Sequence, residues 1–141
     1  MYEIRKKFKV EYAHQLSTAF SKACSDSIHG HSAEIEVFVK VRNLNCDGMC
    51  IDFGEINAII GEYIKSWDHS LVMPDSFPED YLAMLQAHNK NLKIVNYNPT
   101  AENIAKDIFY TITPLLSGKR GKVSKVIFHE TDSGYASYWE D

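Results

Sequence analysis

Residues 31–42 read HSAEIEVFVKVR, and apolar side chains alternate with polar ones along most of this stretch. Alternation with a period of two is typical of a β-strand that buries one face. Phe38 interrupts the polar face, so we expect that face to be partly covered as well. His31 shares the apolar face with Ala33, Ile35, Val37, Val39 and Val41.

A similar alternation begins near the N-terminus, at residues 4–16. The side chains at even positions are mostly apolar, those at odd positions are mostly charged, and His14 falls on the apolar face. Because the two stretches lie close in sequence, we expect them to pair as antiparallel strands. Residues 17–30 between them are rich in serine, lysine and small residues, which predicts a loop.

Helical patterns occupy the middle of the chain. Asp52 is a suitable cap for a helix whose apolar residues recur from Ile56 to Trp67 at spacings of three and four. Thr100 is a suitable cap for a second helix, which we expect Pro114 to bend or end.

The segment between these helices, residues 68–99, is less regular. Two prolines bracket a turn at 74–78, and we expect a short helix over 79–87 and an extended piece over 93–95. This segment therefore gives the weakest structural prediction in the chain.

The C-terminal part predicts a β-hairpin. Gly118 and Gly121 lead into two alternating stretches, 122–131 and 135–139, and Asp132-Ser133-Gly134 forms the turn between them. Strands grouped at the two ends of the chain, with helices between, predict an α+β domain. We expect a four-stranded antiparallel sheet with two helices on one face.

Length and composition limit the class of protein. A chain of 141 residues has the size of one domain, so we assign residues 1–141 to a single domain. The formal net charge of −4 argues against a general nucleic-acid binder. No stretch approaches the ~20 apolar residues of a membrane helix, and the charges within residues 1–10 argue against a signal peptide. Three cysteines without a CxxC pair are a poor disulfide framework and suit a cytoplasmic protein.

The sharpest chemical feature is His29-Gly30-His31 at the start of a strand. Side chains at i and i+2 point to the same side of a strand, so both imidazoles can reach one metal ion. His14 ends the neighbouring strand on its apolar face and can supply a third nitrogen. Three histidines on zinc leave one position open for water or substrate, as in catalytic sites. The alternative is three unrelated histidines.

Other residues suit acid–base work or substrate binding. Cys24 lies five residues before His29, where a dication and an imidazole would favour the thiolate; the alternative is an inert loop cysteine. Asp68 can orient His69 for proton transfer, although adjacent side chains often face apart. Glu130 ends an apolar strand and would need donors if buried; the alternative is an ordinary strand-end glutamate. Cys46 and Cys50 are interpreted as bystanders.

Taken together, the chain resembles the family of 6-pyruvoyl-tetrahydropterin and 6-carboxytetrahydropterin synthases. Each motif is weak alone, but the ordered set spans nearly the whole chain. The motifs are Phe8, Ala13-His14, Cys24, His29-Gly30-His31, Gly48-Met49, Ile51-Asp52-Phe53, Asp68-His69, Pro99-Thr100, Glu102-Asn103 and Glu130-Thr131.

The resemblance implies the tunnelling fold, in which three subunits close their sheets into a barrel and two rings stack as a homo-hexamer, a dimer of trimers. It implies Zn²⁺ on the three histidines and Cys24 as the proton-abstracting thiolate, with Asp68 and His69 as its proton relay. Glu130 would anchor a pterin ring, with Thr131 beside it in the substrate site. The site would lie between subunits.

The implied substrate is 7,8-dihydroneopterin triphosphate, a small molecule. The carboxy branch of the family cleaves its side chain and leaves 6-carboxytetrahydropterin for queuosine and related deazapurines, and we favour this branch. The pyruvoyl branch keeps the side chain, and a non-catalytic, metal-bearing pterin-binding module is a further alternative. The segment 72–98 is longer than the compact family core.

Overall fold

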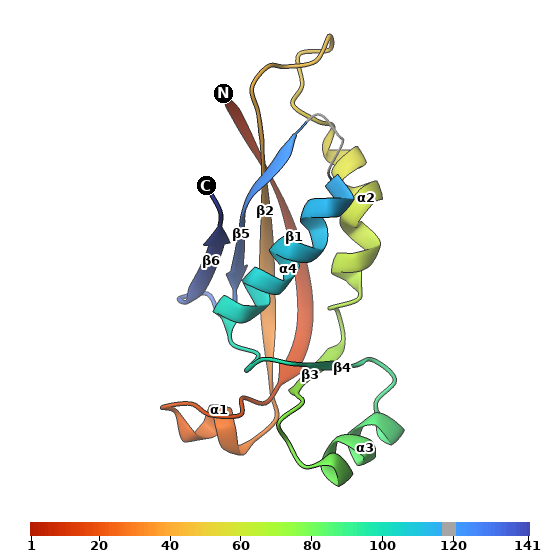
Figure 1. Cartoon of the computed structure of the whole chain (residues 1–141), viewed down its shortest axis with the longest axis vertical. Coiled ribbons are helices and arrows are strands. Elements are labelled where there is room, and N and C mark those ends of the chain that lie inside the picture. The colour runs from red at the N-terminus through yellow and green to blue at the C-terminus, as the bar shows by residue number, and fades with distance from the viewer. Residues whose placement is uncertain (117–120) are drawn as a thin grey trace.

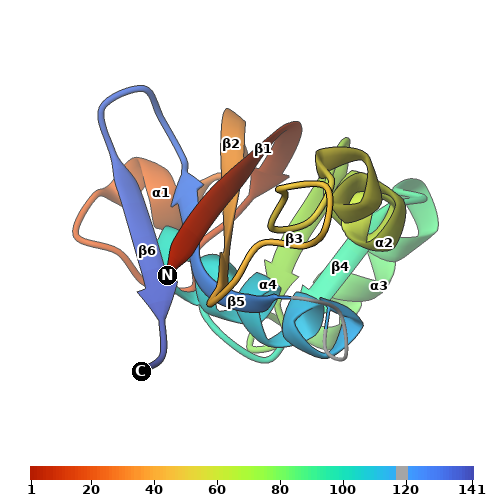
Figure 2. The same cartoon turned by 90° about the horizontal axis from the view of Figure 1, so that it is seen from above.

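The computed structural model describes residues 1–116 and 121–141, which form a strongly curled sheet with two long helices packed on one face (Figures 1 and 2). The predicted α+β class is confirmed. Gly118 lies outside the described residues. The elements are β1 (Tyr2–His14), α1 (Lys22–Asp26), β2 (His29–Val41), α2 (Phe53–Lys65), β3 (Ser70–Pro74), α3 (Glu79–His88), β4 (Leu92–Val95), α4 (Ala101–Leu116), β5 (Lys122–His129) and β6 (Tyr135–Trp139).

The sheet contains the four antiparallel strands that the sequence predicts and two more. The strand order is β4-β3-β1-β2-β5-β6, in which β3 runs parallel to β1 and β4 runs parallel to β3. Both added strands are short, and all five residues of β3 are buried. β4 matches the extended piece expected over 93–95. β3 was not predicted, because a strand that is buried on both faces shows no alternation of apolar and polar side chains.

The register between β1 and β2 determines which side chains lie together at the candidate functional site. Ile35 and Val37 lie opposite Phe8 and Lys6, and further along the same ladder His14 lies opposite His29. The apolar faces of both strands pack under α2 and α4, whose fully buried side chains include Ile60. α2 and α4 lie over the middle of the sheet, and the C-terminal end of β1 extends beyond them towards α1, β3 and β4 (Figure 1).

Several local predictions are confirmed. The Asp52 side chain accepts a hydrogen bond from the Gly54 N–H at 2.6 Å and caps α2. Pro114 lies inside α4, which continues to Leu116, so Pro114 does not end this helix. Phe38 is half-buried, with the Lys125 ammonium 4.1 Å from its ring centroid.

The short helix expected over 79–87 and the extended piece expected over 93–95 are confirmed by α3 and β4, whereas the segment 17–30, expected to be a loop, contains an unpredicted helix. The loop between β1 and β2 includes the single-turn helix α1, and α3 packs on its own small hydrophobic cluster. This cluster consists of Leu71, Met73, Leu82 and Leu85. Across residues 1–116 and 121–141, every helix is too short or too polar to cross a lipid bilayer.

Candidate metal centre

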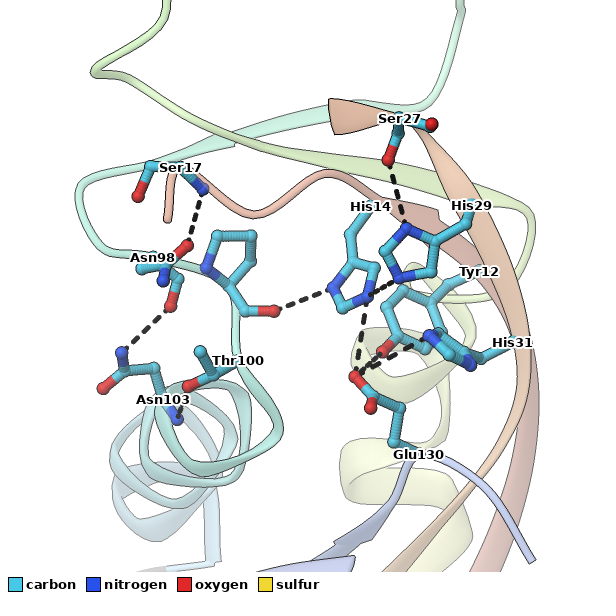
Figure 3. Close-up of polar contacts among 11 residues, drawn as sticks. Tyr12, His14, Ser17, Ser27, His29, His31, Asn98, Thr100, Asn103 and Glu130 are labelled. Atoms are coloured by element: carbon cyan, nitrogen blue, oxygen red, sulfur yellow. Dashed lines mark hydrogen bonds and ion pairs between the residues drawn. The ribbon is translucent and has the colours of Figure 1, made fainter. Parts of the chain in front are cut away.

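Three imidazoles meet at the end of β1 and β2. One ring nitrogen from each of His14, His29 and His31 lies within 4.8 Å of the others, a grouping that can hold a metal ion. His14 is only 1% exposed, and the other two side chains are partly buried. The predicted meeting of these residues is therefore present in the fold (Figure 3).

Backbone carbonyls fix the orientation of two of the rings. Nδ1 of His14 lies 2.8 Å from the Pro99 carbonyl oxygen, and Nδ1 of His29 lies 3.1 Å from the Ser27 carbonyl oxygen. A carbonyl can only accept, so each Nδ1 must carry the proton. Each Nε2 is then unprotonated, which is the tautomer that binds metals.

The site fits a cation better than it fits three free histidines. Nε2 of His14 lies 3.0 Å from Nε2 of His29, and in these tautomers neither atom has a proton to share. Nε2 of His31 is buried and has no hydrogen-bond partner among the described residues. A buried polar atom without a partner costs about 1–3 kcal/mol. A metal ion bound by all three nitrogens removes this cost.

Burial favours the neutral form of His14 and His31, which is the form that a metal requires. Burial lowers the pKa of His14 to about 4, although the bond to the Pro99 carbonyl opposes this shift. Burial also lowers the pKa of His31, while the Glu130 carboxylate acts in the opposite direction. No proton has to be displaced from a neutral imidazole nitrogen before metal binds.

Glu130 approaches the cluster from the end of β5. Its Oε1 lies 3.5 Å from Nε2 of His14 and 3.8 Å from Nε2 of His31. The Tyr12 hydroxyl donates to the same oxygen at 3.2 Å. Burial, reinforced by the Glu130 charge, raises the pKa of Tyr12, so the phenol stays a donor. The histidine cluster thus has a carboxylate beside it, and a buried tyrosine holds that carboxylate (Figure 3).

Tyr12 was not predicted as a site residue. It is buried and packs edge-on against His14, with ring centroids 5.0 Å apart. It lies opposite His31 in the β1–β2 ladder. Its position two residues before His14, on the same strand face, was the signal that could have identified it.

The loop before α4 was also missed as part of the site. Asn98 accepts from the Ser17 N–H at 2.8 Å and donates to the Thr18 carbonyl at 3.0 Å. Asn103 in turn donates to the Asn98 carbonyl at 2.9 Å. These bonds fix the loop that presents the Pro99 carbonyl to His14 (Figure 3). Thr100 caps α4 as expected, at 3.4 Å from the Asn103 N–H.

Cys24 lies on α1, within the segment that joins the two histidine-bearing strands. Its side chain is half-buried, whereas Cys46 is exposed and Cys50 is buried. The carbonyl of Cys24 accepts from the Leu16 N–H at 3.0 Å, so this part of α1 is tied to the end of β1.

Asp68 and His69 form a separate pair. Nδ1 of His69 lies 3.1 Å from Asp68 Oδ2, and 81% of the His69 side chain is exposed. The Glu11 N–H donates to Asp68 at 2.7 Å and holds the pKa of that carboxyl below its ordinary value. Within the described residues of one chain, neither side chain has a hydrogen bond or ion pair to the histidine cluster.

Thr131 lies in the β5–β6 turn. Its hydroxyl accepts from the Gly134 N–H at 3.0 Å, which gives it a role in shaping the turn beside Glu130.

The family model described as 6-pyruvoyl tetrahydropterin synthase matches residues 3–141. The chain belongs to this family. Among curated members, a 6-carboxy-5,6,7,8-tetrahydropterin synthase of Helicobacter pylori (strain J99) is 31% identical over 140 residues, which cover 94% of this chain and 70% of that protein. The protein of the same name from Aquifex aeolicus is 32% identical over 123 residues, covering 82% and 75% of the two chains.

Solved structures share the family fold. An uncharacterized protein from Wolinella succinogenes superposes with a TM-score of 0.84 at 20% identity, covering 99% of this chain and 98% of that one. The 6-pyruvoyl tetrahydropterin synthase of Caenorhabditis elegans gives a TM-score of 0.73 at 18% identity, covering 99% and 96%. The tetrahydropterin synthase fold therefore extends over the whole chain.

Replacing one histidine of the cluster should remove the metal. His31→Ala should weaken zinc affinity by more than about 100-fold, because changes in residues that merely support metal ligands already cost 10–100-fold. Metal content after dialysis, measured by plasma mass spectrometry, tests this. His88→Ala is the matched control, since His88 is exposed at the end of α3 and should leave the metal content unchanged. Full zinc occupancy in His31→Ala would refute the assignment.

In the metal-free protein, the free energy of unfolding should fall as the pH drops from 6.5 towards 4. His14 stays neutral in the folded protein over this range but takes up a proton in the unfolded chain, so acid favours unfolding. One such group adds at most about 1.4 kcal/mol per pH unit to the slope. Urea unfolding of chelator-treated protein at a series of pH values measures the effect. His14→Gln should lose this part of the slope, and identical slopes in both proteins would contradict it.

Proposed function

We propose that the chain is a zinc-dependent 6-carboxytetrahydropterin synthase. It would convert 7,8-dihydroneopterin triphosphate and one water molecule to 6-carboxy-5,6,7,8-tetrahydropterin, acetaldehyde and triphosphate, a step towards queuosine and related deazapurines. The observation that carries the proposal is the set of three converging imidazoles beside the Glu130 carboxylate. The names of the curated relatives in Helicobacter pylori and Aquifex aeolicus support the carboxy product.

Zinc is the metal that suits this donor set. Neutral imidazoles are good zinc ligands, and three of them leave a coordination position for substrate. When bound, zinc would act as a Lewis acid on the side-chain oxygens of the substrate and acidify the neighbouring C–H bond.

Two residues of the chain would then handle the substrate. The Cys24 thiolate would take the proton from the activated carbon, since α1 connects the strands that carry His14 and His29. Glu130 would bind the pterin ring by accepting from its 2-amino group and an adjacent ring N–H, a charge-assisted pair of bonds. The Tyr12 hydroxyl already holds one oxygen of this carboxylate, which orients the anchor before substrate arrives.

Asp68 and His69 would serve a site completed by a second copy of the chain. The pair is preformed, with Asp68 holding Nδ1 of His69, and the exposed imidazole faces away from the buried core of its own chain. An exposed proton carrier of this kind suits a pocket that closes on oligomerisation. We therefore propose the homo-hexamer, a dimer of trimers, as the active assembly.

The pyruvoyl product is the second candidate, and the description of the matching family model favours it. Both reactions would use the same metal and thiol. They differ in whether the side chain of the substrate is cleaved.

The products of one incubation separate the two candidates. Zinc-loaded protein supplied with 7,8-dihydroneopterin triphosphate should release acetaldehyde and 6-carboxytetrahydropterin in equal amounts, detected by aldehyde trapping and mass spectrometry. A pyruvoyl product without acetaldehyde would move the chain to the other branch. No consumption of substrate by the metal-loaded oligomer would refute the proposed function.

Cys24→Ala should abolish turnover while zinc and pterin binding persist. Removal of a catalytic base costs about 10²-fold or more in kcat. The matched control is Cys46→Ala, which changes an exposed cysteine of the same chain and should leave kcat unchanged. Substrate consumption and metal content are measured on both variants. Full activity in Cys24→Ala would exclude the thiol as the base.

A further inference from the structure

The helix that carries Cys24 depends on other parts of the chain for its position. α1 spans only Lys22–Asp26, and all of its residues are at least partly exposed. A single helical turn is unstable by itself, because nucleation costs more than one or two hydrogen bonds return. The contacts that hold α1 therefore decide where the thiol lies.

Two residues directly after His14 supply these contacts. The Leu16 N–H donates to the Cys24 carbonyl at 3.0 Å. Nε2 of Gln15 donates to the Ser25 carbonyl at 2.9 Å. Since β1 ends at His14, the Cys24 and Ser25 carbonyls are bonded to the two residues that directly follow a histidine of the cluster. These two bonds from residues 15 and 16 thus fix the position of the thiol relative to the histidine cluster.

A tyrosine from α3 completes the arrangement. The Tyr81 hydroxyl donates to Oε1 of Gln15 at 2.9 Å, so the amide is engaged at both ends. Gln15 is 7% exposed, which makes an unpaired amide atom costly and one orientation of the amide strongly preferred. Tyr81 is itself held, because its ring packs edge-on against Phe77 at 5.6 Å and borders the Leu71 cluster.

We infer that Gln15 and Tyr81 are positioning residues for Cys24 and that α3 braces the Cys24 helix through them. The inference rests on the proposed function, in which Cys24 is the base. Neither residue needs to touch the substrate. Their contribution is to keep a weakly structured helix in one place relative to the histidine-bearing end of β1.

Two variants test this bracing contact, which consists of the Tyr81–Gln15 and Gln15–Ser25 hydrogen bonds, at different points. Tyr81→Phe removes the hydroxyl and leaves Oε1 of Gln15 without its donor. Gln15→Met removes both bonds while keeping a similar volume. kcat should fall roughly threefold to tenfold in Tyr81→Phe, the size of one hydrogen bond, and further in Gln15→Met, with KM within about twofold of the parent. Tyr110→Phe is the matched control, because it removes a hydroxyl of α4 that is bonded to Tyr138 of β6 and, within the described residues, makes no hydrogen bond to α1 or Gln15, so it should change neither constant.

Alkylation by iodoacetamide, followed by mass spectrometry of each cysteine, separates local loosening from general destabilisation. The half-buried Cys24 should react roughly threefold or more faster in both brace variants, while Cys50, buried in the main core, should keep the parent rate. Acceleration of both cysteines together would assign the residues a general structural role and overturn the inference. Unchanged Cys24 alkylation in both variants would overturn it as well.

The alkylation experiment requires no substrate, so its outcome is independent of the proposed reaction. If the parent protein fails to turn over the pterin triphosphate while Cys24 alone accelerates in the variants, the brace stands and the proposed function fails. If turnover occurs and Cys24 alkylation and kcat match the parent in both variants, the proposed function stands and the brace fails.

Discussion

His14 lies opposite His29 in the β1–β2 ladder, and Tyr12 lies opposite His31. Everything else at the site depends on this register. Because side chains alternate along a strand, a slip by one residue would move His14 and the core residues of β1 to the other face together. The apolar residues that bury the sheet under α2 and α4 therefore also hold the three histidines in register. Stability of the core and formation of the site follow from the same strand pairing.

The strand register brings the three imidazoles together, and the loops at this end of the sheet orient two of them. The Pro99 carbonyl selects the tautomer of His14, and the Ser27 carbonyl does the same for His29. Asn98 fixes the loop that carries Pro99, and Gln15 fixes the helix that carries Cys24. The candidate metal centre thus receives its histidines from β1 and β2, and backbone carbonyls of neighbouring loops orient two of their rings. Such outer groups are what keep imidazole nitrogens aimed at a metal.

Much of this arrangement is readable from the sequence. The i, i+2 spacing of His29 and His31, with His14 on the apolar face of a strand, indicated the cluster but left three unrelated histidines as an alternative, and the family resemblance then implied the full set. The two long helices α2 and α4 and the hairpin were equally predictable, because their periodicity is strong, whereas the single-turn helix α1 was not predicted. β3 was not, since a short strand buried on both faces has no alternating pattern. The Pro99 and Ser27 carbonyls could not be predicted either, because every residue carries a carbonyl and only the fold decides which one approaches a histidine.

X-ray absorption spectroscopy of the zinc-loaded protein tests the central claim most directly. We predict a first shell of three imidazole nitrogens, with the remaining position filled by oxygen. Replacing one of the three histidines should reduce the imidazole scattering by the contribution of one ligand. A first shell containing sulfur, or one whose imidazole count is unaffected by replacing His14, His29 or His31, would contradict the three-histidine metal centre.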